Sequence, residues 1–140
     1  MSRWKMLMGS AVLWLTACGA GTPAVLETDQ TTYAPGAKVM LRLGNRSLQP
    51  LGYNLCFTAL QRLDGQDWVV VPRPETEPRE VCPAYQAMLN PGSTSSSFRP
   101  LDASLPEGEY RYRTNVELQW DEERMELVSN SFRVVSPSTP

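Results

Sequence analysis

The chain has no histidine among its 140 residues, and its only lysines are Lys5 and Lys38. Histidine is the side chain that most often transfers protons near neutral pH, and it is a common metal ligand. Without it, a serine or cysteine nucleophile lacks its usual base, and a thiolate zinc site lacks its imidazole ligands. No Gly-x-Ser-x-Gly elbow marks the hydroxyl-rich stretch 93–97 as a nucleophile. We therefore expect no catalytic residue, no metal and no cofactor.

The sequence also lacks an apolar run of about 20 residues, the length that a membrane-spanning helix requires. Its most apolar segment, Met6 to Ala17, is short and is interrupted by Ser10 and Thr16. Two cationic residues, Arg3 and Lys5, precede this segment, and small residues close it. That order is typical of a cleaved secretory signal.

The apolar segment closes on Leu15-Thr16-Ala17-Cys18-Gly19. This sequence resembles the Leu-(Ser/Thr/Ala)-(Ala/Gly)-Cys lipobox of bacterial lipoproteins, whose cysteine becomes the acylated first residue of the mature chain. The resemblance implies a signal peptide over residues 1–17, and diacylglyceryl and palmitate-type chains that anchor Cys18 to membrane lipid in the cell envelope. Because Gly19 is not aspartate, the outer membrane is expected in a Gram-negative cell. An ordinary signal peptidase also accepts these small residues, so plain secretion is the alternative.

Residues 18–23 form a tether of small residues, and the folded domain is expected over residues 24–136. Even when fully extended, Gly19 to Pro23 span only about 15–18 Å. The length that remains after cleavage fits one domain. Loss of Arg3 and Lys5 leaves 11 basic residues against 15 acidic ones, a formal charge of −4. This balance argues against binding to nucleic acid and against electrostatic adhesion to anionic lipid.

Three cysteines are an awkward number for an exported protein, in which thiols tend to be oxidised. If Cys18 carries lipid, Cys56 and Cys82 remain as one pair. A disulfide between them would stabilise the fold by about 3–4 kcal/mol in the chain-entropy account. Two free thiols in a reducing compartment are the alternative, and a zinc site would lack half of its ligands.

After residue 24, strand signals replace helix signals, because 12 prolines and 9 glycines divide the chain into short runs with period-two alternation. Leu51–Leu60 is expected as one strand with Phe57 on its apolar face. Trp68–Val71 is apolar on both faces and is expected as a strand covered on both sides. The other predicted strands are Ala24–Thr28, Lys38–Leu43, Ala84–Leu89, Gly108–Trp120 and a final strand that includes Met125, Leu127, Phe132 and Val134.

The clearest alternation runs from Tyr110 to Trp120, with the even-numbered residues predicted in the core and Arg111 and Arg113 in solvent. These arginines are expected to pair across strands with glutamates 109, 117 and 126, although an anion-binding patch with Arg99 or Arg133 is the alternative. The acidic triplet 121–123 is interpreted as a solvated turn, because it lacks the spaced oxygens of a calcium loop.

About seven short strands in one domain indicate an all-β, immunoglobulin-like antiparallel sandwich. Leu105–Tyr112 resembles the Gly-x-Tyr segment of a tyrosine corner, with Tyr110 as the bonding tyrosine. Tyr112 stands where antibody domains place their second core cysteine. The order and spacing of several segments resemble the bacterial immunoglobulin-like domains of uncharacterised exported proteins and lipoproteins: Thr32–Gly36, Leu43–Ser47, Trp68–Val71, Asn90-Pro91-Gly92, Leu105–Arg111 and Ser129–Val134.

This resemblance implies a binding or structural module that is not an enzyme. The first functional hypothesis is a membrane-anchored module that contributes to the structure of the envelope or binds another envelope protein through loops or a sheet edge. The alternative is a protease inhibitor that presents loops from one end of the sandwich, with Arg73–Glu80 and Ser93–Arg99 as the inhibitory segments.

Overall fold

The computed structural model describes residues 21–73 and 82–138, and these ranges contain eleven strands and one short 3-10 helix, η1. The predicted signal peptide and Cys18 lie outside the described residues. In chain order the elements are β1 (Ala24–Thr28), β2 (Thr32–Tyr33), β3 (Lys38–Asn45), β4 (Leu51–Tyr53), η1 (Leu55–Phe57), β5 (Ala59–Asp64), β6 (Asp67–Val70), β7 (Ala87–Leu89), β8 (Thr94–Pro100), β9 (Gly108–Leu118), β10 (Glu123–Val128) and β11 (Phe132–Val134).

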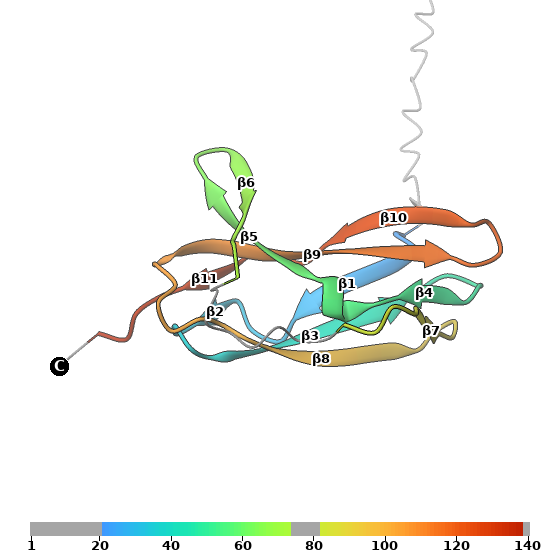
Figure 1. Ribbon diagram of the computed structural model, residues 1–140, viewed down its shortest axis with the longest axis horizontal. Coiled ribbons are helices and arrows are strands. Elements are labelled where there is room, and N and C mark those ends of the chain that lie inside the picture. Colours follow the sequence, from blue (N-terminus) through green and yellow to red (C-terminus); the bar gives the residue numbers. More distant parts are fainter. Residues whose placement is uncertain (1–20, 74–81, 139–140) are drawn as a thin grey trace, which may run out of the picture.

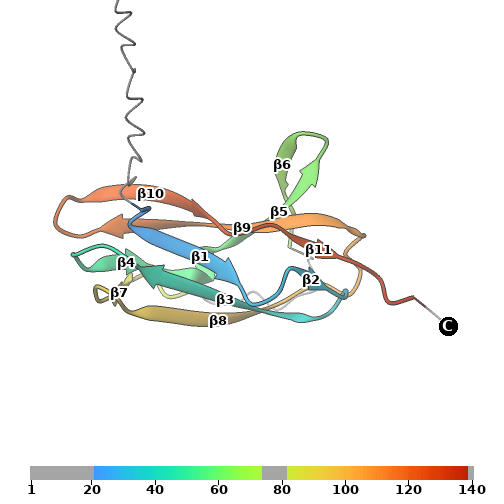
Figure 2. The same ribbon diagram turned by 180° about the vertical axis from the view of Figure 1, so that it is seen from behind.

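The strands form two sheets that pack face to face (Figures 1 and 2). One sheet has the order β1-β3-β8, and the other is built around β9, which pairs with β4, β5, β10 and β11. All pairings are antiparallel except that of β2 with β11, which is parallel. The predicted all-β sandwich is confirmed. Its strands number eleven instead of about seven because three-residue and two-residue strands extend the sheet edges.

The core lies between β3 and β9, as their alternation predicts. Val39, Leu41 and Leu43 of β3 are fully buried, and they face Tyr110 and Tyr112 of β9 across the sandwich. The ring of Phe132 on β11 lies edge-on to Tyr33 and stacked on Tyr112, with ring centroids 5.2 and 5.6 Å apart. Apolar burial of this kind is the main stabilising contribution in a domain of this size.

Tyr110 forms the tyrosine corner that the sequence predicts. Its hydroxyl donates a hydrogen bond to the carbonyl of Pro106 at 2.7 Å, while the rest of the side chain is buried. This bond fixes the chain where it enters β9. Together with the two packed sheets, the corner identifies the sandwich as immunoglobulin-like.

A second tyrosine fixes the turn between β1 and β2. The hydroxyl of Tyr33 donates to Oδ1 of Asp29 at 2.5 Å and accepts from the amide of Gln30 at 2.8 Å. The hydrogen bond from Tyr33 holds the pKa of Asp29 below its usual range, and burial raises the pKa of Tyr33 to about 12. The parallel strand β2 is thereby held beside β11.

The prediction of one continuous strand over Leu51–Leu60 is wrong. The side chain of Asn54 accepts from the amide of Cys56 at 3.1 Å and donates to the carbonyl of Pro83 at 2.7 Å. Asparagine favours such local side-chain bonds over a strand ladder. The chain therefore turns through η1, and Phe57 is 65% exposed instead of buried.

Trp120 was expected on the core face of β9, but β9 ends at Leu118 and Trp120 lies in the following turn, 71% exposed. The left-handed backbone of Glu122, with φ of 51°, closes this turn into β10. The prediction of core residues in β9 is confirmed from Tyr110 to Leu118 and wrong for Trp120.

We expect Tyr110→Phe to lower the free energy of unfolding by about 0.5–1.5 kcal/mol, because the Pro106 carbonyl loses its hydrogen bond while the ring still fills the core. Urea unfolding followed by fluorescence measures the change. Tyr85→Phe is the matched control, because that side chain is 73% exposed and lies outside the core. Equal unfolding midpoints for the two variants would contradict a stabilising corner.

Candidate binding surface

The hairpin of β5 and β6 projects from the sandwich (Figures 1 and 2). β5 pairs with β9 only over Ala59–Arg62, so that the end of β5 and the start of β6 extend beyond β9. The turn between the strands places Gly65 at φ of 64°, a conformation that favours glycine. Asp64 and Asp67 flank the turn and give the hairpin an acidic tip.

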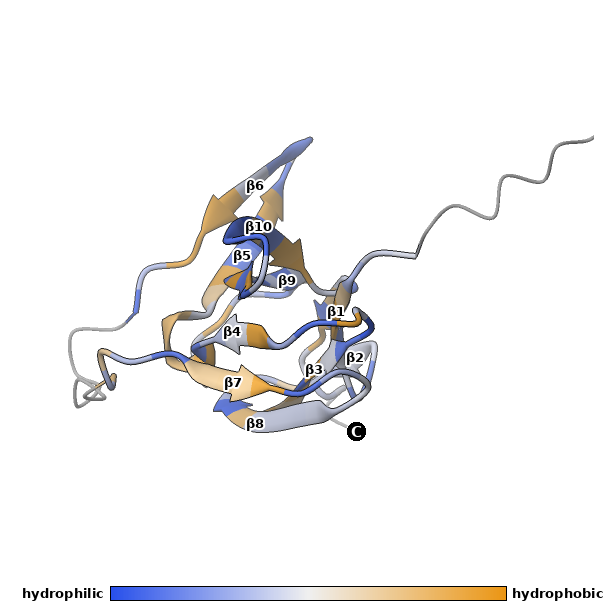
Figure 3. Cartoon of the chain, turned by 90° about the vertical axis from the view of Figure 1, so that its right-hand side faces the viewer, coloured by the Kyte–Doolittle hydropathy of each residue, from blue (hydrophilic) through white to orange (hydrophobic). Residues whose placement is uncertain are grey.

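The expectation that Trp68–Val71 is a strand covered on both sides is wrong, because its two central valines are exposed. Val69 is 50% exposed and Val70 is 47% exposed, whereas Trp68 is half-buried. Figure 3 shows this part of β5 and β6 as hydrophobic outside the sandwich. We call Trp68, Val69 and Val70 the ribbon. A clustered apolar segment on a projecting element is typical of an interaction site.

Arg111 of β9 contacts the ribbon through the ring of Trp68. Its guanidinium carbon lies 4.3 Å from the centroid of the Trp68 ring, and its Nε donates to Oε1 of Gln61 at 2.8 Å. Gln61 is only 4% exposed and is the register partner of both Arg111 and Val70. The cation–π contact and the hydrogen bond hold Trp68 in one orientation before any partner arrives.

Among the described residues β6 pairs with β5 alone, which leaves its other backbone edge open. Because the amide of Val71 donates to Leu60, hydrogen-bonded pairs alternate along the hairpin, and Val69 directs its backbone groups toward β5. Trp68 and Val70 consequently direct their N–H and C=O groups away from β5. Two residues with this spacing form the unit to which an additional strand can bind.

Cys56 and Cys82 form a disulfide, the pair that the sequence predicts. Arg73, which follows β6, donates to the carbonyl of Cys56 at 3.3 Å, and Asn54 donates to Pro83. The described residues on both sides of the segment 74–81 are therefore fixed to η1. The disulfide therefore stabilises the base of the hairpin.

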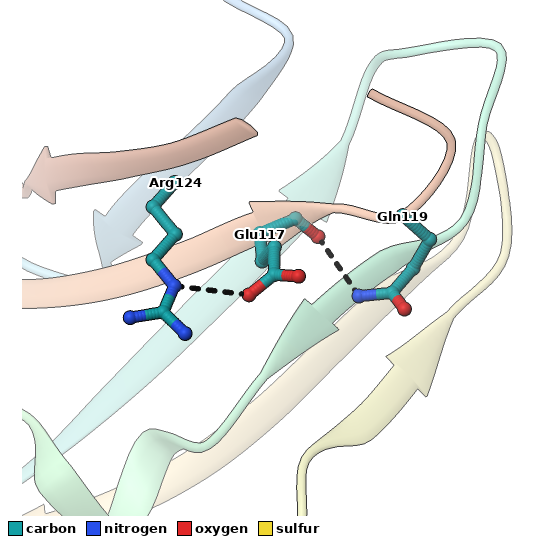
Figure 4. Close-up of polar contacts among 3 residues, drawn as sticks. All are labelled: Glu117, Gln119 and Arg124. Carbon is teal, nitrogen blue, oxygen red and sulfur yellow. Dashed lines mark hydrogen bonds and ion pairs between the residues drawn. The ribbon is translucent and has the colours of Figure 1, made fainter. Parts of the chain in front are cut away.

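The predicted cross-strand charge pair is found for Arg113, and β9 and β10 form a second pair that the sequence did not predict. Arg113 lies 3.7 Å from Glu126, and Arg124 lies 3.2 Å from Glu117. Figure 4 shows the second pair, together with the side chain of Gln119, which donates to the carbonyl of Glu117. Arg111 departs from the prediction, because it stacks on Trp68 instead of pairing with a glutamate.

The structure does not show the two predicted inhibitory segments as a pair of loops within the described residues. Of Arg73–Glu80, only Arg73 lies within the described residues. Ser93–Arg99 is largely β8, a strand paired with β3, so its assignment as an inhibitory loop is wrong. Alternate residues of β8 point inward, as in a strand. The hydroxyl of Ser95 accepts from the hydroxyl of Tyr53 at 3.0 Å, and the guanidinium of Arg99 donates to the carbonyl of Leu55.

Two other surface features are candidate sites: a groove on the three-stranded sheet and the acidic turn between β9 and β10. A shallow groove crosses the outer face of β1, β3 and β8, where Glu27, Arg42 and Thr94 mix opposite charges with hydroxyls. Asp121 of the acidic turn accepts from Gln49 at 2.9 Å. Within residues 21–73 and 82–138, no three potential metal ligands cluster. No helix in the described part of the chain is long and apolar enough to cross a membrane.

No protein-family model and no curated protein matches the chain. Among solved structures, it is similar to the ApaA protein from Bordetella pertussis, with 19% identity over 73% of this chain and 76% of that one and a TM-score of 0.42. It is also similar to the PapD-like domain 7 of human CEP192, with 14% identity, 93% and 99% coverage and a TM-score of 0.40.

A third similar structure is Spo0M, a sporulation control protein from Bacillus subtilis, with 14% identity over 84% of this chain and 51% of that one and a TM-score of 0.43. These identities and scores are too low to carry an inference about function.

We expect replacement of both Cys56 and Cys82 by serine to lower the free energy of unfolding by roughly 3.5 kcal/mol, because the disulfide joins residues 26 positions apart. Urea unfolding with and without reductant measures the loss. Reductant should shift the unfolding midpoint of the native chain and leave that of the double variant unchanged. A reductant-insensitive native chain would show that the bond contributes nothing to stability.

Proposed function

We propose that the protein is a lipoprotein of the cell envelope whose single immunoglobulin-like domain binds another envelope protein and has no catalytic activity. The observation that carries the anchor is the lipobox-like Leu15–Cys18, which follows a basic and then apolar start. The observation that carries the binding role is the exposed, preorganised ribbon on β6.

The chemistry of the chain supports a binding role. A chain without histidine lacks the common proton-transfer group, and the serines of β8 bond to tyrosine or lie in a strand ladder. The ribbon instead combines an oriented aromatic ring and two valines, and Arg111 of β9 lies against the ring. Aromatic residues and arginine are enriched where proteins bind one another.

The mode of binding proposed here is addition of an extended segment of the partner to the open edge of β6. Main-chain groups of Trp68 and Val70 provide the hydrogen bonds, and their side chains select the apolar residues that can lie beside them. The acidic tip at Asp64 and Asp67 disfavours partners with a negative charge at the end of that segment.

The position of the hairpin suits a tethered protein. β5 pairs with β9 at Arg111, seven residues before the end of β9 at Leu118, and seven residues of strand span about 23 Å. The described chain begins beside the Leu118 end. An anchor at Cys18 therefore leaves the ribbon on the half of the domain farther from the attachment point. No described feature favours the protease-inhibitor alternative, since Ser93–Arg99 is largely a strand.

We expect Cys18→Ala to abolish labelling of the protein by radioactive palmitate in its own cells, and to move the protein out of the membrane fraction. The variant removes only the acylated sulfur, whereas Cys56→Ser with Cys82→Ser retains Cys18 and serves as the control that should still label. Equal labelling of the Cys18→Ala variant and the native chain would contradict the anchor.

We expect Val70→Lys to abolish cross-linking of the protein to its envelope partner in intact cells, because the lysine places a charge in the strand-addition site. Its stability should remain within about 0.5 kcal/mol of the native value, since Val70 is half-exposed. Val128→Lys is the matched control, because that valine is 43% exposed on β10. A partner retained by Val70→Lys, or lost equally with Val128→Lys, would contradict binding at β6.

A further inference from the structure

Two large apolar side chains are exposed at the end of the sandwich opposite the tyrosine corner. Leu48, in the loop between β3 and β4, is 88% exposed, and Trp120, in the turn between β9 and β10, is 71% exposed. Both follow strands whose inward residues are fully buried. Exposed side chains of this kind contribute nothing to the core. When two of them lie on the same surface, they indicate a site of interaction.

Hydrogen bonds join the two loops into one platform. Oε1 of Gln49 accepts from the amide of Trp120 at 2.9 Å, and Nε2 of Gln49 donates to Asp121 at 2.9 Å. The amide of Gln119 donates to the carbonyl of Pro50 at 3.1 Å. Leu48 and Trp120 are consequently presented by loops that hold each other in position.

The described chain begins at the same platform. The amide of Arg46 donates to the carbonyl of Pro23 at 2.8 Å, and Ala24 is the register partner of Asn45. Figures 1 and 2 show the start of β1 at the end of the molecule that carries the β9–β10 turn. Pro23 is thus bonded to the loop that contains Leu48.

The short tether turns this proximity into a constraint. Gly19 to Pro23 separate Cys18 from β1, and they reach at most about 15–18 Å. If acyl chains on Cys18 enter a bilayer, the end of the domain bonded to Pro23 lies within that distance of its surface. Tryptophan favours the boundary between headgroups and hydrocarbon, and leucine favours the hydrocarbon beyond it.

We infer that this end of the domain rests on the bilayer, with Leu48 and Trp120 in the lipid interface. The inference rests on the proposed lipid anchor and adds the orientation of the domain. Acidic residues 121–123 exceed the nearby arginines, Arg46 and Arg124, so the platform suits zwitterionic headgroups better than anionic ones. Contact at this end leaves the ribbon on β6 at a distance from the bilayer, beside the other half of β9.

Fluorescence tests the inference directly, because Trp68 and Trp120 are the only tryptophans after residue 17. The Trp68→Phe variant is purified from its own membrane and reconstituted into phosphatidylcholine vesicles with or without bromine on the acyl chains. Emission from Trp120 should be lost in brominated vesicles. In the matched Trp120→Phe variant, emission from Trp68 on the ribbon should be unchanged.

The possible outcomes are distinguishable. Vesicle association with unquenched Trp120 overturns the orientation and leaves the lipid anchor intact. Quenching of Trp68 as well as Trp120 also overturns it, because the domain would then lie flat. Failure of the protein to associate with vesicles contradicts the anchor and removes the premise of the inference. If Trp68→Phe folds poorly, the native chain provides the same test. Brominated vesicles should then remove the Trp120 emission and leave the emission that the Trp120→Phe variant shows, which comes from Trp68.

Discussion

Pairing along β9 (Gly108–Leu118) is the constraint on which the rest of the structure depends. One face of this strand is buried from Tyr110 to Leu118, and its two edges pair with four other strands. Each neighbour uses only part of its length. β5 uses the half near Tyr110 and then leaves the sheet as the hairpin, whereas β4 and β10 use the half near Leu118. Division of this one strand therefore separates the ribbon from the Leu48–Trp120 platform.

The two surfaces give the proposed function a direction. The platform lies beside the start of β1, where a short tether from Cys18 would hold it at lipid. The ribbon lies farther along β9, on a hairpin whose outer strand has an open edge. An anchored domain with this arrangement offers its apolar binding segment to other envelope proteins instead of burying it against its own membrane. The Cys56–Cys82 disulfide stabilises the base of that hairpin.

The sequence predicted the parts of the fold that depend on alternation and on local motifs. The core face of β9 required only alternation. The tyrosine corner at Tyr110 followed from the resemblance of one local motif, and the Cys56–Cys82 pair followed once Cys18 was assigned to lipid. The ribbon was not predicted because an apolar run such as Trp68–Val71 has the same sequence pattern in a covered strand and in an exposed one. Whether the strand is covered depends on how far β5 pairs along β9. Asn54 carried a signal that could have been used, since its side chain breaks a strand by bonding locally.

The central claim, an exported and lipid-anchored domain stabilised by one disulfide, is tested most directly by the intact mass of the protein purified from its own membrane. The account predicts a chain that begins at Cys18, carries the mass of its acyl chains and lacks the two hydrogens that Cys56 and Cys82 lose in the disulfide. A mass that retains residues 1–17 with three free thiols would contradict the anchor, the compartment and the orientation at the bilayer together.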